Sequence, residues 1–562
     1  MRIQYVLKRG LFIGLTAMFA ATVLANPVVS LSDTAKVVGK SEQGVDAFLG
    51  IPYAQAPIGA LRWQLPQPAK PIQGTFQATQ EGAICPQWQQ GKFEGKEDCL
   101  NLDVYRPEHA KHELPVLVYI HGGNNQTGEA HEFNPQALAK ALNAVIVQVN
   151  YRLGVLGFNP LKALKTEQPI QASGNFGLLD QLAALQWVHQ NIQHFGGRAD
   201  QVTVAGFSAG GRDVMAMLIS PLFKGKFQHA IVFSGGMTTA PVAPSQQVFR
   251  QAFAPLVVRD HIQPNIASAQ AWLASGGKAV RDYLQQLPAE QLAPLMKGAG
   301  IRMSHFPHLY RDGAVIPKQG FATTDYNSVP VIMLSGQTEF SIFALTDPYF
   351  VKAWHDGTLM NDPDMLTKYQ FVYHYGGKLY SLFNVQQSAQ RMFAHYKAPI
   401  YATEVAFGDD PLVTRNEQMA LLGAFHGVFM PLLDRTWRQA LLGKVFQQPG
   451  AVDLSKQFRR YLAHFIRTGN PNGQHLVRWL PWSPKHDNQG QSLLVLNANR
   501  HKALIQMSSK SYDEAVLLDA MAKDHHLSDQ AKQEMIDQVL NGRWFSNSLD
   551  KRFHVPSLWP KS

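Results

Sequence analysis

The sequence lacks the features by which nucleic-acid-binding proteins and metalloenzymes are usually recognised. Its formal net charge of +10 is spread along the chain, and no basic cluster is dense enough to indicate binding of nucleic acid. The zinc motif His-Glu-x-x-His is absent, and the pair His525-His526 lies in a polar segment that is typical of a solvated surface. We therefore expect no nucleic acid, no metal and no other cofactor.

The N-terminus lacks an apolar run of membrane-spanning length. Residues 1–25 begin with three cations, continue with the uncharged stretch Leu11–Leu24 and end just before Asn26, a pattern that is typical of a secretory signal peptide. The uncharged stretch has 14 residues, whereas about 20 are needed to cross a bilayer, and no cysteine follows that could carry a lipid. We expect cleavage near Ala25 and export to the periplasm or the medium, without a stable membrane anchor.

Cysteine is also scarce, since Cys85 and Cys99 are the only two in 562 residues. In an exported protein this pair is expected to form one disulfide, whose loop closure would stabilise the fold by about 3 kcal/mol. Two buried free thiols are the alternative.

Two apolar runs and a helical stripe predict the fold class. Pro115–Ile120 and Ala144–Val149 are continuous apolar stretches, typical of strands buried on both faces. Leu178–His194 repeats apolar residues at helical spacing before a further strand-like run at Val202. The alternation of strand, helix and strand predicts a mostly parallel sheet flanked by helices, an α/β fold.

The run from Val202 leads directly into Gly-x-Ser-x-Gly, which makes Ser208 the candidate nucleophile. The sharp turn from strand to helix requires strained dihedral angles at the serine, and Gly206 and Gly210 avoid side-chain clashes there. The amide of Ala209 would then point to where an oxyanion forms. In a chain with 44 glycines the motif also occurs by chance. A second glycine-rich loop, His121–Asn125, follows the first apolar run and could present further amides.

At this point the sequence resembles the type B carboxylesterase and cholinesterase-like family of α/β-hydrolases over most of the mature chain. The matching stretches are Phe48–Ala54, Glu97–Tyr105, Asn150–Phe158, Gly174–Asp180, Phe207–Gly211, Ala230–Gly235, Asp312–Pro317, Gly423–Gly427 and Thr468–Asn472. The resemblance implies an α/β-hydrolase fold and supports the Cys85–Cys99 disulfide. It also implies structural ion pairs between Arg62 and Glu97 and between Arg152 and Asp180.

The resemblance implies the remaining catalytic groups. A serine hydroxyl needs a histidine to accept its proton and a carboxylate to orient that histidine, in the chain order serine, acid, histidine. His426 lies in Gly423–Gly427, which matches the histidine motif of the family. Glu339 follows the strand-like run Val331–Leu334 and resembles the acidic member. The rival acids, which stay open at this stage, are Asp213, Asp312 and Asp347.

Three departures from the family concern the expected oxyanion hole and pocket. The implied oxyanion donors are Gly123, Asn124 and Ala209, with Asn124 in place of the usual glycine. Phe207 and Phe429 stand where the family usually has glutamates, which predicts a less negative substrate pocket. Arg212-Asp213 replaces small residues.

We expect one domain over residues 26–519, followed by a variable C-terminal tail over 520–562 packed on it. The segments 237–326 and 343–416 are expected to form helical insertions around the cleft. The leading interpretation is a secreted serine carboxylesterase that hydrolyses small carboxylic esters through an acyl-enzyme, with a preference for neutral apolar esters. The alternatives are a non-catalytic binding protein of the same fold, an amidase, or a lipase with the Cys85–Cys99 loop and Trp88 as its lid.

Overall fold

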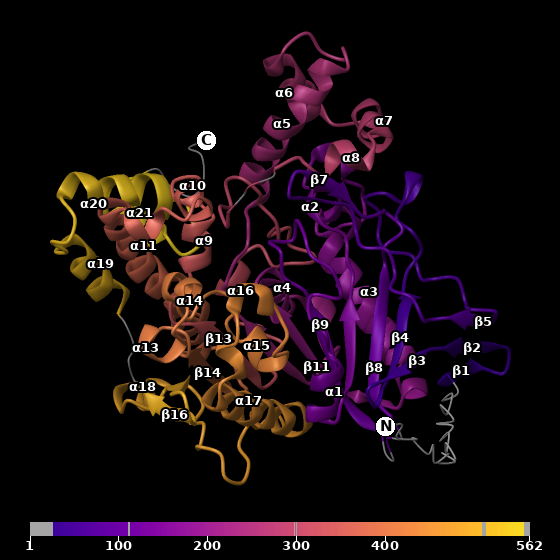
Figure 1. Ribbon diagram of the computed structural model, residues 1–562. Helices are drawn as coiled ribbons and strands as arrows, with labels where there is room; N and C mark the ends of the chain where they lie inside the picture. The colour runs from indigo at the N-terminus through magenta and orange to yellow at the C-terminus, as the bar shows by residue number, and fades with distance from the viewer. Residues whose placement is uncertain are drawn as a thin grey trace, which may run out of the picture.

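The computed structural model describes residues 26–108, 110, 113–296, 298, 300–508 and 513–555, so the predicted signal peptide lies outside the described residues. The chain is organised around an 11-stranded sheet with the order β16-β15-β14-β13-β12-β11-β9-β10-β8-β4-β3 (Figure 1). Its strands are β3 (Lys40–Glu42), β4 (Val45–Pro52), β8 (Asn101–Pro107), β9 (Leu114–Ile120), β10 (Val145–Val149), β11 (Gly197–Phe207), β12 (His229–Phe233), β13 (Val331–Gly336), β14 (Ile400–Val405), β15 (Leu493–Ala498) and β16 (Ala503–Ser508).

The middle of the sheet is parallel and buried, as the sequence predicts. Neighbouring strands from β10 to β15 pair in parallel, while the outer strands pair antiparallel. Every residue of β9 and β10 is buried, because helices cover both faces of a sheet of this kind. The carboxyl ends of the parallel strands therefore meet at one edge, where such sheets place their sites.

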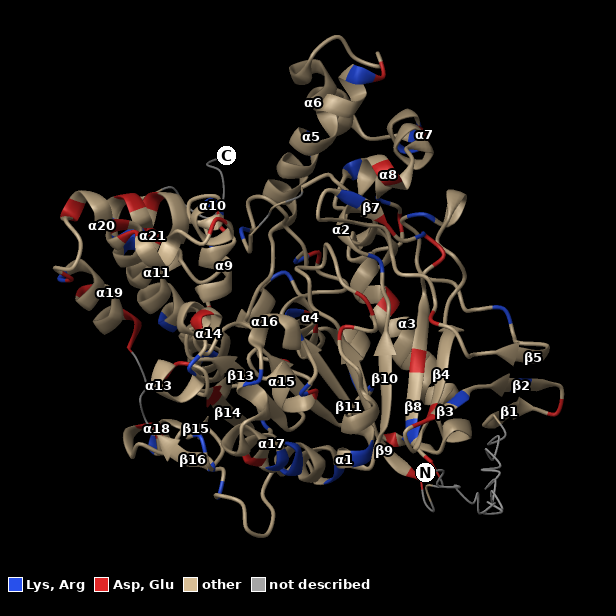
Figure 2. Cartoon of the chain, in the orientation of Figure 1, with Lys and Arg blue, Asp and Glu red and all other residues tan. Residues whose placement is uncertain are grey.

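Helices α1 (Gln136–Leu142) and α17 (Pro449–Thr468) pack against each other and against the sheet. Helices α3 (Phe176–Asn191) and α4 (Ala209–Met217) cover strands β9, β11 and β12 on the other face. The predicted helix over Leu178–His194 corresponds to α3 and the 3₁₀ turn η4 (Ile192–Phe195) that continues it. Lysine and arginine residues of α1 and α17 lie together at the lower edge of the view in Figure 2.

The two expected insertions are largely helical and rise above the carboxyl edge of the sheet (Figure 1). The first contains α5 (Val242–Arg259), α6 (Ile266–Ser275), α7 (Lys278–Gln286), α8 (Ala289–Leu292) and η6 (Gly320–Ala322). The second contains α9 (Ser341–Leu345), α10 (Val351–His355), η7 (Leu359–Asn361), α11 (Pro363–Leu382), η8 (Phe383–Gln387), α12 (Ser388–Phe393) and α13 (Pro411–Thr414). The prediction for 343–416 was wrong in one respect, because this segment also supplies strand β14 between β13 and β15. The burial of β14 depends on neighbours distant in sequence, which a reading of single segments does not reveal.

The C-terminal segment, defined here as residues 513–555, is helical and packs on α11. It contains α19 (Glu514–Ala522), α20 (Asp529–Met535), the π-helical turn η10 (Ile536–Leu540) and α21 (Asn547–Arg552). The boundary expected at residues 519–520 falls inside α19. The C-terminal segment therefore begins with this whole helix. Across the described part of the chain, no helix is both long and apolar enough to cross a membrane.

Short elements complete the chain. They are β1 (Val28–Ser32), β2 (Ala35–Val38), η1 (Gly59–Leu61), β5 (Gly74–Gln77), β6 (Gln87–Gln89), β7 (Lys92–Glu94), α2 (Gly154–Gly157), η2 (Lys162–Leu164), η3 (Gln171–Ser173), η5 (Pro221–Phe223), α14 (Glu417–Leu422), α15 (Met430–Leu433), α16 (Gln439–Leu442), η9 (Val445–Gln447) and α18 (Pro484–Asn488). Strands β6 and β7 form a separate hairpin.

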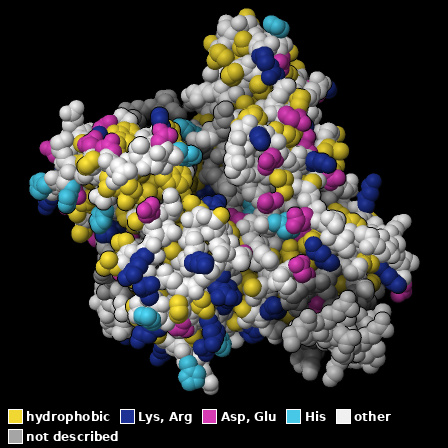
Figure 3. Space-filling model, in the orientation of Figure 1, with side chains coloured by type: hydrophobic (Ala, Val, Ile, Leu, Met, Phe, Trp, Pro, Cys, Tyr) yellow, Lys and Arg dark blue, Asp and Glu magenta, His cyan; other side chains and the backbone are white. Residues whose placement is uncertain are grey.

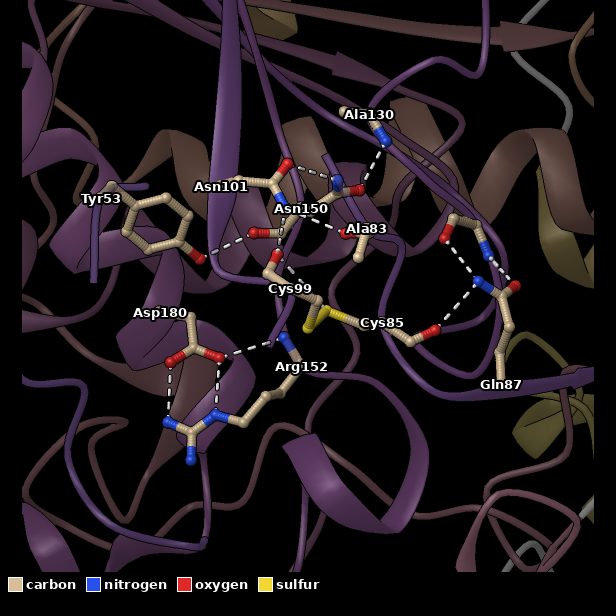
Figure 4. The surroundings of a disulfide bond; sticks show 11 residues. Tyr53, Ala83, Cys85, Gln87, Cys99, Asn101, Ala130, Asn150, Arg152 and Asp180 are labelled. Atoms are coloured by element: carbon tan, nitrogen blue, oxygen red, sulfur yellow. Dashed lines mark hydrogen bonds and ion pairs between the residues drawn. A yellow bond between two sulfur atoms is a disulfide. The ribbon is translucent and has the colours of Figure 1, made fainter. Parts of the chain in front are cut away.

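The predicted disulfide between Cys85 and Cys99 is present (Figure 4). Beside it, Arg152 donates two hydrogen bonds from its guanidinium to Asp180, at 2.7 and 2.8 Å, and both side chains are buried. The second expected ion pair, between Arg62 and Glu97, is also formed. The disulfide and the Arg62–Glu97 pair fix the loops on either side of the hairpin β6–β7.

Candidate active site

Ser208 lies at the tight turn between β11 and α4, at the carboxyl end of the central strand. Its φ of 55° and ψ of −112° are strained for a residue with a side chain. A Cβ at Gly206 would lie 2.2 Å from the carbonyl oxygen of Gly210, and one at Gly210 would lie 2.2 Å from that of Ile120. Only glycine at both positions allows this close backbone approach.

Glu339 and His426 form a buried pair. Oε1 of Glu339 accepts a hydrogen bond from Nδ1 of His426, and Oε2 accepts from the Gly336 amide at 2.6 Å and the Ser335 hydroxyl at 3.0 Å. The carboxylate is thus fixed by its own strand end at β13, and this contact orients the imidazole. Nε2 of His426 is buried and has no hydrogen-bond partner within the described residues.

His426 and Ser208 line the same cavity, which has a volume of about 730 Å³. Aromatic rings surround the imidazole, with ring centroids 4.8 Å away at Phe207, 4.9 Å at Phe343 and 5.9 Å at Tyr380. This apolar packing restricts the orientation of the His426 imidazole. It also leaves few competing hydrogen-bond donors or acceptors around Nε2.

The glycine-rich loop after β9 adopts left-handed backbone geometry at three successive residues. The φ angles are +92° at Gly123, +58° at Asn124 and +57° at Asn125. Asparagine tolerates this region better than most residues with a side chain. In the part of the chain that the structure describes, the amides of Gly123 and Asn124 donate no hydrogen bond to the protein, which leaves them available to a ligand. Gly123 and Asn124 line the same cavity as Ser208.

The cavity opens in the hollow that Figure 3 shows between the two groups of helices. Its rim is formed on one side by the hairpin β6–β7, including Trp88, and on the other by Phe343 of α9 and by Trp437. Trp88 is only partly buried and pairs across the hairpin with Phe93. The tryptophan expected at the pocket is therefore at its edge rather than in the core.

The two phenylalanines that replace family glutamates lie in different environments. Phe207 lines the cavity. Phe429 is fully buried behind it, stacked on Phe233 at 4.2 Å and in edge contact with Phe207 at 5.2 Å. Phe429 was expected at the substrate pocket, but it is fully buried and is not among the residues that line the cavity.

The rival acids are held elsewhere. Asp312 accepts hydrogen bonds from the amides of its own turn, and Asp347 is paired with Arg543. Asp213 accepts from the side-chain amides of Asn125 and Gln181, and burial raises its pKa to about 6. None of these contacts involves a histidine.

Glu132, which was not predicted from the sequence, also lines the cavity. Its carboxylate accepts hydrogen bonds from the Tyr119 hydroxyl at 2.7 Å and the Gly122 amide at 3.2 Å. Burial raises its pKa to about 7 despite these bonds. No motif marks this residue, because its position depends on the fold of the loop after β9.

Comparisons with known proteins identify the family of this chain. The model of the carboxylesterase family matches residues 25–371. Cocaine esterase from Homo sapiens is 30% identical over 501 residues, which cover 80% of this chain and 83% of that protein. Carboxylesterase 1E from Rattus norvegicus is 30% identical over 538 residues, covering 83% and 90%. A solved PNB esterase superposes with a TM-score of 0.67 and 26% identity, covering 88% of this chain and all of that one. Together with the α/β-hydrolase fold, these matches show that the chain belongs to the carboxylesterase family and is a carboxylic ester hydrolase.

Proposed function

We propose that the protein is a serine esterase that works through an acyl-enzyme. Oγ of Ser208 attacks the ester carbonyl carbon and gives its proton to Nε2 of His426, while Glu339 holds the Nδ1–H tautomer. The amides of Gly123, Asn124 and Ala209 bind the oxyanion that forms. The alcohol leaves with the proton from His426. Water then attacks the acyl group, gives a proton to His426 and releases the acid, and Ser208 recovers its proton.

The observation that carries this proposal is the pairing of Glu339 with His426. It leaves a single imidazole nitrogen, Nε2, buried and without a hydrogen-bond partner among the described residues, in the wall of the cavity that Ser208 also lines. An oriented histidine with one free nitrogen, lining the same cavity as a strained serine, supplies the groups that general-base catalysis requires.

Labelling with a fluorophosphonate probe tests the nucleophile. We expect one equivalent on Ser208, located by peptide mass spectrometry, and no labelling of Ser208→Ala, which should lose nitrophenyl ester turnover by a factor of about 10⁴ or more. A wild-type protein that folds but is not labelled would favour the non-catalytic binding protein instead.

We further propose a preference for neutral, apolar esters. Phe207 places a ring instead of a carboxylate beside the imidazole, and Phe429 supports it from behind. Burial keeps much of Glu132 protonated near neutral pH, because its pKa is about 7. The test compares kcat/KM for butyryl esters of choline and of an uncharged alcohol of similar size at about pH 6.5. Equal or better use of the choline ester would refute the preference.

We also propose that the protein is exported. The uncharged N-terminal stretch and the Cys85–Cys99 disulfide support this. Intact mass of the secreted protein should correspond to a chain that begins at Asn26. A cytoplasmic product that retains Met1 would contradict export.

A further inference from the structure

Arg212 is a buried cation one helical turn after Ser208. Its side chain is completely inaccessible, and its amide donates to the Ser208 carbonyl at 3.0 Å. The guanidinium makes a hydrogen bond from Nη2 to Oδ1 of Asn124, at 3.2 Å. Nε and Nη1 have no acceptor among the residues that the structure describes. A buried arginine is normally paired with a carboxylate, so the site of Arg212 is unusual.

The neighbouring acid does not neutralise Arg212 by direct contact. Both oxygens of Asp213 are bonded to side-chain amides, those of Asn125 and Gln181. Burial lowers the pKa of Arg212 only to about 10, so the guanidinium stays charged at neutral pH. A positive charge is thus retained directly behind the glycine-rich loop.

The main partner of this guanidinium is an aromatic ring from the C-terminal segment. Cζ of Arg212 lies 3.5 Å from the ring centroid of Trp544, a close cation–π contact between two buried groups. The preceding residue, Arg543, is anchored to Asp347 at 2.6 Å and also donates to the carbonyl of Gly300, which lines the cavity. The segment is therefore fixed at two points beside the candidate active site.

Asn124 is held through both ends of its side-chain amide. Oδ1 accepts from Arg212, and Nδ2 donates to Oε1 of Gln126 at 2.8 Å. The backbone of Asn124 lies in the left-handed region. Holding its side chain in place also restrains the peptide bond between Gly123 and Asn124, whose N–H is the proposed oxyanion donor.

We propose that Arg212 is a positioning residue for the oxyanion loop and that Trp544 holds it in place, so that the C-terminal segment controls the rate of acyl transfer without supplying a reacting group. This inference rests on the proposed esterase function, in which Asn124 supplies an oxyanion donor. The proposed role of Arg212 differs from a purely structural role because Arg212 acts through one side chain, that of Asn124.

The test measures kcat and KM for nitrophenyl butyrate, and Ki for a trifluoromethyl ketone, whose serine adduct carries an oxyanion. Rates are normalised to active sites counted by phosphonate labelling. We expect Trp544→Ala to lower kcat about tenfold, to change KM less than about twofold, and to raise Ki by the same factor as kcat falls. Trp544→Phe retains an aromatic face and should keep more of the rate. The matched control is Val516→Ala, at an exposed residue of the same segment.

The decisive measurement is a double-mutant cycle with Asn124→Gly, which keeps the amide and removes the side chain. If Arg212 acts through that side chain, Trp544→Ala should have little further effect on kcat in the Asn124→Gly background. Effects of Trp544→Ala that are equal in both backgrounds, or confined to KM, would overturn the inference. Should Trp544→Ala fail to fold, the cycle is run with Trp544→Phe. A wild-type protein that is not labelled would instead refute the proposed function.

Discussion

The turn around Ser208 and the C-terminal segment both contact Arg212, but by different means. The turn is built from backbone atoms in close approach, where Gly206 and Gly210 leave no room for a Cβ. The C-terminal segment reaches the same arginine through the ring of Trp544. The turn therefore depends on the absence of side chains at Gly206 and Gly210. The contact from the C-terminal segment depends on the presence of one side chain, that of Trp544.

This difference separates two kinds of contribution to one site. Backbone geometry at the turn determines the position of the Ser208 hydroxyl. A change in that geometry would affect both folding and catalysis. A side-chain contact from a distant segment adjusts a loop that is already formed, and its loss should affect rate more than folding. Four experiments test this distinction, in order of decreasing expected effect.

Glu339→Gln should give the largest loss, about 10³-fold or more in kcat, with the fold retained. The Ser335 hydroxyl and the Gly336 amide both donate to one oxygen of residue 339, so a glutamine would keep its oxygen there and turn its NH₂ toward His426. The imidazole would then carry its proton on Nε2 and could not accept one from Ser208. Ester kinetics and thermal unfolding are the measurements. Undiminished activity would transfer the acid role to another carboxylate.

Gly210→Ala should destabilise the protein far more than Gly542→Ala. A Cβ at Gly210 would lie 2.2 Å from a backbone oxygen of the neighbouring strand, whereas nothing lies within 4 Å of one at Gly542. Gly542 has a φ of +64°, so alanine there should cost about 1–2 kcal/mol. At Gly210 we expect about 4 kcal/mol or more, or loss of soluble protein. Equal unfolding free energies of the two variants would contradict this expectation.

The double variant Cys85→Ser, Cys99→Ser should lower the free energy of unfolding by about 2–4 kcal/mol and leave measurable esterase activity. The disulfide closes the loop that contains the hairpin β6–β7. This hairpin forms the rim of the cavity and contains none of the proposed reacting groups. Chemical denaturation and ester kinetics test this. Detection of two free thiols in the unreduced native protein would show that the bridge does not form.

Glu132→Gln should have the smallest effect, and one that depends on pH. Burial raises the pKa of Glu132 from 4.5 to about 7, so the unfolded chain loses this proton at lower pH than the folded protein does. The contribution of Glu132 to stability therefore falls as pH rises from about 4.5 to about 7. Glutamine does not titrate, so the stability of the variant relative to the wild type should increase between about pH 4.5 and about pH 7.

Asp550→Asn, in the C-terminal segment, is the matched control for that measurement. Burial raises the pKa of Asp550 to about 6, so its stability effect should have the same sign. Asp550 is not part of the cavity lining, so only Glu132→Gln should also change the pH dependence of kcat/KM. A pH profile that Glu132→Gln leaves unchanged would exclude an effect of Glu132 on turnover.

Local patterns in the chain were sufficient to predict much of this site. The apolar runs ending at Ile120 and Phe207 identify buried parallel strands. The glycines around Ser208 predict the strained turn, because the residues that clash or leave room there lie within a few positions of the serine. Family resemblance, rather than periodicity, singled out Glu339 and His426, which the structure brings into contact. Strand β14 was missed because its burial comes from distant neighbours.

What the sequence by itself determined is the fold class, the position of the turn and the types of group available for chemistry. Only the tertiary structure decided which of them meet. Phe429 lies behind Phe207 instead of in the cavity, Glu132 reaches the cavity wall, and Trp544 covers Arg212 from the far end of the chain. Backbone strain is a property of a few adjacent residues, whereas burial, pKa and side-chain contacts depend on every element that packs around a group.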